Sequence, residues 1–139
     1  MTANASLNQS VHLRQAASDY LSQCYEISAH VKDLIEELKT AEKNLQLGSL
    51  IPALEEFLEN FQISIKESHH ELDDDINPYA SLEYLNIYQK RGTDLLKEAA
   101  GDFGKLRTLL LNAVDDIAIY DGFEACSHAL VNTKGGAHA

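Results

Sequence analysis

The strongest constraint on the fold is an apolar residue at every third or fourth position from about Leu7 to Leu47. This spacing places the apolar side chains on one face of a helix that packs at a shallow angle, as in bundles and coiled coils. We call this row the first-helix seam. It consists of Leu13, Ala17, Tyr20, Cys24, Ile27, Val31, Leu34, Leu38, Ala41 and Leu45.

Three shorter segments carry a similar pattern, at about 49–72, 78–101 and 102–130. Asn77 followed by Pro78 is a strong helix-start signal, and Ser49 and Asp102 are candidate caps for the second and fourth segments. The chain contains only 2 prolines and 7 glycines, which favours long uninterrupted helices. The sequence therefore predicts an all-α fold, an antiparallel four-helix bundle with a long first helix.

Two glycines fall inside the predicted helices. Gly92 lies on the apolar face of the third segment, which indicates either a close contact between helices or a local kink. Near Gly122 the apolar pattern of the fourth segment shifts to Ile119, Phe123 and Cys126. We therefore expect a stutter in the last helix.

The 139 residues are enough for one domain, which we place at 1–131, with 132–139 as a flexible tail that lacks periodicity. No cationic and apolar leader opens the chain, and no run of 18 apolar residues is present. We expect a cytoplasmic protein that does not enter a membrane. Cys24 and Cys126 are then expected to be buried free thiols, with a disulfide between the first and last helices as the alternative.

The length of the first segment raises the possibility of self-association. A helix of about 40 residues is about 60 Å long, against about 36 Å for about 24 residues in the second segment. The first helix must either bend, for example near residues 28–30, or project beyond the bundle. A projecting apolar seam needs a partner to cover it, so a homo-oligomer formed through the first helix is one hypothesis.

The net charge of −11 is concentrated in one quarter of the chain, because residues 51–75 hold eight acids and one base. Such a field repels nucleic acid and anionic membranes and favours a basic protein partner, although a solvated acidic face is the alternative. Tyrosines at helix surfaces are common anchors in protein contacts. The predicted partner-binding residues are Glu55, Glu56, Glu59, Glu67, Glu71, Asp73, Asp74, Asp75, Tyr25, Tyr84 and Tyr88.

No residue pattern indicates catalysis, so we expect a protein that is not an enzyme and needs no cofactor. Neither cysteine has a nearby basic residue in the sequence that would activate a thiol. Asp121, Glu124 and His128 have the 3–4 spacing of metal ligands on a helix, but they are weak candidates. The leading hypothesis is an acidic helical protein-interaction module of the inhibitor, immunity, chaperone or adaptor type. The alternatives are a self-assembling structural protein and a metal- or ligand-binding bundle.

Overall fold

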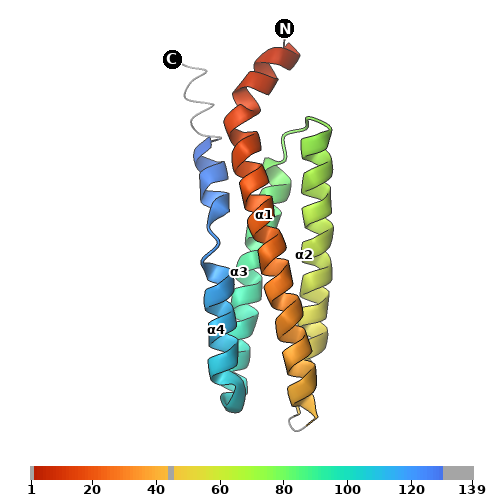
Figure 1. The fold of residues 1–139 in the computed structure, drawn as a ribbon, viewed down its shortest axis with the longest axis vertical. Coiled ribbons are helices and arrows are strands. Elements are labelled where there is room, and N and C mark those ends of the chain that lie inside the picture. Colours follow the sequence, from red (N-terminus) through yellow and green to blue (C-terminus); the bar gives the residue numbers. More distant parts are fainter. Residues whose placement is uncertain (1, 44–45, 130–139) are drawn as a thin grey trace.

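The apolar repeats form long helices that run alternately up and down, which confirms the predicted all-α bundle (Figure 1). The computed structural model describes residues 2–43 and 46–129, and these ranges contain no strand. After α4 the chain becomes helical again over 122–129, which we call the terminal segment. The bounds are α1 Thr2–Glu42, α2 Leu50–Asp73, α3 Tyr79–Asp102, the 3₁₀ turn η1 Gly104–Leu106 and α4 Arg107–Ala118.

Two helix pairs build the bundle. α1 packs mainly on α2, α4 packs mainly on α3, and contact between α2 and α3 joins the pairs. The core contains apolar residues from every helix, with Tyr20 and Phe61 as the largest fully buried side chains. None of the helices in the described ranges has an apolar stretch long enough to cross a membrane.

α1 is continuous over 41 residues, whereas α2 has 24, so of the two alternatives the helix is not interrupted near residues 28–30. The surplus length lies at the N-terminal end, where α1 extends past the end of α2 (Figure 1). Each seam residue from Leu13 to Leu38 is at most 5% exposed, and Ala41 is half-buried. The same chain therefore covers this part of the seam, which leaves it unavailable to a second copy. Leu45 and the tail 132–139 lie outside the described residues.

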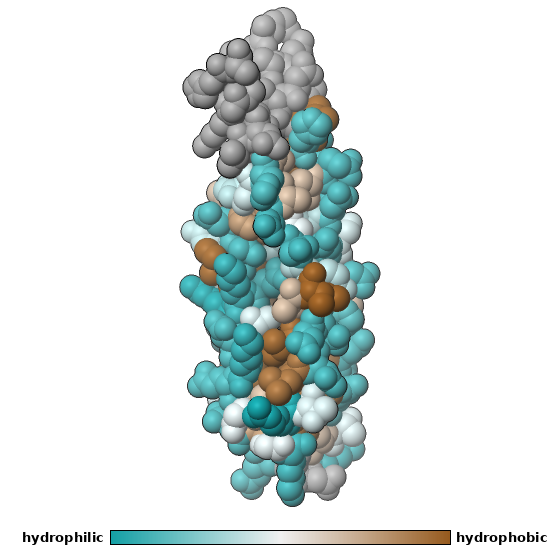
Figure 2. Space-filling view, turned by 90° about the vertical axis from the view of Figure 1, so that its left-hand side faces the viewer, coloured by the Kyte–Doolittle hydropathy of each residue, from teal (hydrophilic) through white to brown (hydrophobic). Residues whose placement is uncertain are grey.

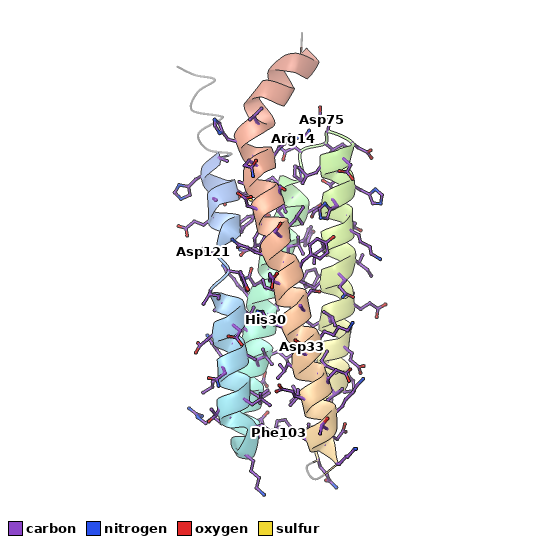
Figure 3. The ribbon with its side chains drawn as sticks, in the orientation of Figure 1. Arg14, His30, Asp33, Asp75, Phe103 and Asp121 are labelled. Carbon is purple, nitrogen blue, oxygen red and sulfur yellow. The ribbon has the colours of Figure 1, made fainter. Side chains whose placement is uncertain are left out.

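The three aspartates at 73–75 end α2, as expected for negative charges at the negative end of a helix dipole. The backbone N–H of Ile76 donates to the carbonyl of Glu71 at 2.7 Å, which closes a Schellman-type turn. Asp75 has φ of 62° in this turn, a left-handed conformation that glycine usually occupies. Its carboxylate pairs with Arg14, which ties the end of α2 to α1 (Figure 3).

Of the three predicted helix caps, one is confirmed and two are wrong. Asn77 does stabilise the start of α3, because its Oδ1 accepts the backbone N–H of Tyr79 at 2.9 Å. Ser49 precedes α2 but makes no side-chain cap. Asp102 is the last residue of α3 rather than the cap of the fourth helix, because η1 comes before α4.

Gly92 permits a close contact between α2 and α3, and α3 remains helical through this position. A Cβ atom at this position would lie 2.7 Å from the ring of Phe57, closer than real side chains come. Phe57 in turn stacks on Phe61, with 5.5 Å between the ring centroids. Of the two explanations that the sequence allowed for Gly92, the close helix contact is therefore confirmed.

The predicted single helix over 102–130 is wrong, because the chain leaves helical conformation between Ala118 and Gly122. This interruption, residues 119–121, is called the break below. It lies where the apolar pattern shifts, but Ile119 does not continue the apolar face and is 68% exposed. The break is therefore found in place of the expected stutter.

Candidate functional site

The acids of residues 51–75 are divided among different surfaces because α2 lies between α1 and α3. Glu55 and Glu59 line a groove on the α1 side, which also contains Lys32 and Lys39. We call it the lysine groove, and its volume is about 360 Å³. Lys39 Nζ lies 3.4 Å from Glu55 Oε2, so part of this negative charge is neutralised within the chain.

A second groove of about 250 Å³ lies on the α3 side of α2 and brings together three of the predicted partner-binding residues, Glu67, Tyr84 and Tyr88. Tyr84 is 61% exposed and Ile63, across the groove, is 48% exposed. The described residues that line this groove include one carboxylate and no cation. We call it the tyrosine groove, and its lining is Asn60, Ile63, Ser64, Glu67, Ser81, Tyr84 and Tyr88.

The two tyrosines of this groove are held differently. The guanidinium of Arg91, one turn further along α3, lies 5.8 Å from the ring centroid of Tyr88, within the range of a cation–π contact. Tyr88 is also half-buried against the core. Tyr84 is therefore the more available of the two rings.

The remaining predicted acids have local roles or face solvent. Glu71 accepts a hydrogen bond from the hydroxyl of Ser81, which links α2 to the start of α3. Asp75 is paired with Arg14, whereas Asp73, Asp74 and Glu56 are exposed. These acids do not line the tyrosine groove among the described residues.

Tyr25 does not join the other two tyrosines. It is 52% exposed on α1, and its ring centroid lies 5.5 Å from that of His69 on α2. The predicted tyrosine anchors are thus on two sides of the molecule, with Tyr25 on the α1–α2 side and Tyr84 on the α2–α3 side.

The weak metal candidates do not form a ligand set. Asp121 belongs to the break, so the helical spacing that would align it with Glu124 and His128 is absent. His128 Nε2 is 3.9 Å from Glu124 Oε1, and both side chains are more than 70% exposed. Within the described ranges, no group of three histidine, cysteine or acidic residues is arranged to hold a metal ion.

Two glutamines that were not among the predicted functional residues hold the break in place. The buried side chain of Gln89 donates from Nε2 to the carbonyls of Ile117 at 3.0 Å and Tyr120 at 2.6 Å. Its Oε1 accepts the hydroxyl hydrogen of Tyr20 at 2.8 Å. An interrupted helix leaves backbone N–H and C=O groups without their helical hydrogen-bond partners. The side-chain amide of Gln89 provides hydrogen-bond donors for two of these carbonyls.

Gln23 satisfies the other side of the break. Its Oε1 accepts the backbone N–H of Gly122 at 2.8 Å. A Cβ atom at residue 122 would lie 2.6 Å from that oxygen, so a glycine is needed for this approach. A sequence signal for the network does exist, because Gln89 interrupts the apolar 3–4 row formed by Leu85 and Gly92.

The break also leaves a hollow of about 460 Å³ between α3 and the terminal segment, which we call the break groove. Figure 3 labels Asp121 at the break, between α4 and the terminal segment, and His30 on α1. The Nε2 of His30 is 3.3 Å from the hydroxyl of Tyr120, a further polar link between α1 and the break. The face of the molecule that carries α4 is mostly hydrophilic, with a limited hydrophobic strip in its lower half (Figure 2).

The two cysteines are free and buried, as predicted. Burial raises the pKa of the Cys24 thiol to about 12 and that of Cys126 to about 11. Burial likewise raises the pKa of the Tyr20 hydroxyl. Both thiols are therefore protonated near neutral pH, a state that is unsuited to nucleophilic attack.

No protein-family model matches the chain, and no curated protein or solved structure shows significant similarity to it. The geometry of the grooves is thus the basis for a functional proposal.

Proposed function

We propose that the protein is a non-enzymatic, acidic helical interaction module that binds a basic protein surface through the tyrosine groove. The observation that carries this proposal is the position of an unpaired carboxylate, Glu67, in a hollow beside the exposed side chains of Ile63 and Tyr84. Within the described ranges, Glu67 takes part in no ion pair. An acid next to exposed apolar groups can accept a basic side chain and bury its hydrocarbon stem.

The tyrosine groove suits this role better than the lysine groove. Glu55 of the lysine groove already has Lys39 as a partner, so a basic ligand would have to displace an existing pair. The lysine groove also presents Lys32, which would repel such a ligand. Glu67 has neither of these competitors among the residues that line its groove.

Tyr84 supplies the expected anchor. A tyrosine offers a large apolar area with few rotatable bonds, and it loses little side-chain entropy when a partner covers it. Arginine is the basic residue that fits best, because its planar guanidinium can stack on the ring while it pairs with a carboxylate. The net charge of −11 adds long-range attraction, which speeds encounter with a basic partner and weakens as salt rises.

Self-association through the first helix is not part of this proposal. That hypothesis rests on a part of α1 that projects beyond the bundle, whereas the seam between Leu13 and Leu38 is buried in the bundle of the same chain. In the tyrosine groove, by contrast, Ile63 and Tyr84 are exposed in the single chain and can contact a partner directly.

Photo-crosslinking from two matched tyrosine positions tests the proposal. A photoreactive phenylalanine analogue is placed at residue 84 in one variant and at residue 25 in another, because both native rings are more than half exposed. In the cells that naturally make the protein, we expect one discrete heterologous crosslink from position 84 and none of that mass from position 25. Equal crosslinking from both positions, or crosslinking only from 25, would contradict the proposal.

A further inference from the structure

The break in the last helix is specified by the core of the bundle. The side-chain amides of Gln89, which is buried on α3, and Gln23, which is half-buried on α1, form hydrogen bonds with the backbone on either side of the break. The hydroxyl of Tyr20 fixes the orientation of the Gln89 amide. A continuous helix would satisfy the same backbone groups without any of these side chains. Burying polar groups is costly unless they are all paired, so this arrangement holds one defined geometry at residues 119–121.

The hollow beside the break has a size and lining suited to a small molecule. Its volume of about 460 Å³ falls in the range of ligand sites, roughly 300–1,000 Å³. Ala118, Tyr120 and Phe123 contribute apolar groups to its lining. Because the network fixes the chain at this point, the hollow cannot close simply by straightening of the helix.

The charges around the break groove favour a cation. Asp121 and Glu124 contribute two carboxylates, whereas Lys90 on α3 is the cation among its described lining residues. Neither Asp121 nor Lys90 takes part in an ion pair within the described ranges, and Glu124 has only the distant, exposed His128.

We propose that the break groove binds an organic ammonium group attached to an apolar body. The ammonium pairs with Asp121 and Glu124, and the apolar body lies against Tyr120 and Phe123. Such a group belongs either to a free amine or to a lysine side chain of another protein. This site is on the opposite side of α3 from the tyrosine groove, so it does not depend on the function proposed above.

An NMR titration of the ¹⁵N-labelled protein tests this site with matched probes. The probes are 2-phenylethylammonium, Nα-acetyl-lysine amide, the anion 3-phenylpropionate and the neutral 2-phenylethanol. We expect saturable shifts at residues 86–93 and 118–124 with an ammonium probe, at a Kd of about 1 mM. Tighter binding of 2-phenylethylammonium would identify a free amine as the ligand, and tighter binding of the lysine derivative would identify a lysine side chain.

Two variants show whether the carboxylates are responsible. The double variant Asp121→Asn with Glu124→Gln is expected to raise the Kd about fivefold or more. Both residues are exposed, so circular dichroism should show unchanged helicity. Glu98→Gln, which removes an exposed acid of α3 that lines neither groove, is the control and is expected to leave the Kd unchanged. The proposal is overturned if neither ammonium probe gives saturable shifts, if 3-phenylpropionate binds as tightly, or if the double variant binds like the native chain.

Discussion

The two sides of α3 pack in opposite ways. Toward α2 the contact is apolar and close, with Gly92 seated against the ring of Phe57. Toward α4 the contact is also apolar, through Leu110, Val114 and Ile117, but at the break it gives way to a buried polar network centred on Gln89. Each side also carries a groove, the tyrosine groove toward α2 and the break groove toward the terminal segment.

The difference shows that a helix can impose its geometry on neighbours by shape or by hydrogen bonding. On the α2 side, the absence of a side chain at Gly92 sets the distance between two intact helices. On the other side, the amide of Gln89 takes up carbonyls that an intact helix would have used itself. The α2 side therefore keeps its neighbour regular, and the other side keeps its neighbour interrupted.

The largest effect on stability is expected from Gln89→Leu. This change leaves the hydroxyl of Tyr20 and the carbonyls of Ile117 and Tyr120 without their partner. Each unsatisfied buried group costs about 1–3 kcal/mol, so we expect the free energy of unfolding to fall by about 3 kcal/mol or more. Urea denaturation monitored by circular dichroism measures the change.

A matched control and a rescue variant make this prediction specific. Gln62→Leu replaces an exposed glutamine of α2 and is expected to change stability by less than about 0.5 kcal/mol. Adding Tyr20→Phe to Gln89→Leu removes the stranded hydroxyl and is expected to recover part of the loss. Equal stability of Gln89→Leu and the native chain would mean that the network does not hold the break.

A smaller loss is expected from Gly92→Ala on the α2 side. The new methyl group would overlap the ring of Phe57. Overpacking of this kind costs about 1–3 kcal/mol, and the higher helix propensity of alanine offsets about 1 kcal/mol of this cost, so we expect a net loss of up to about 2 kcal/mol. Gly101→Ala is the control, because this helical glycine has open space around it and alanine favours helix by about 1 kcal/mol. Denaturation should therefore show opposite signs for the two changes.

The contact with Phe57 can be checked by a double-mutant cycle. In a Phe57→Leu background the smaller side chain leaves room for the methyl group, so Gly92→Ala is expected to cost less than in the native chain. An identical cost in both backgrounds would contradict the contact.

The apolar side of this comparison could be predicted from the sequence. The 3–4 repeat predicted the helices and the seam of α1, because packing of apolar side chains follows directly from helical periodicity. It also placed Gly92 on a buried face, with a close helix contact and a kink as the two possible roles. The cap by Asn77 also followed from local rules.

The polar side could not be predicted in the same way. Glutamine is usually exposed, and the partners of Gln89 are 69 residues earlier at Tyr20 and 28 and 31 residues later at Ile117 and Tyr120. Likewise, counting acids located the negative charge but did not show that Glu55 pairs with Lys39 while Glu67 lines a groove with Tyr84. That division depends on which neighbour of α2 each side chain faces.

The most direct test of the proposed function uses charge reversal at two sites on α2. Glu59→Lys alters the lysine groove and Glu67→Lys alters the tyrosine groove, with the same change in net charge. For the purified partner crosslinked from position 84, we expect Glu67→Lys to weaken binding about tenfold or more and Glu59→Lys to weaken it about twofold. Equal effects of the two reversals, or a larger effect of Glu59→Lys, would contradict the assignment of the tyrosine groove as the binding surface.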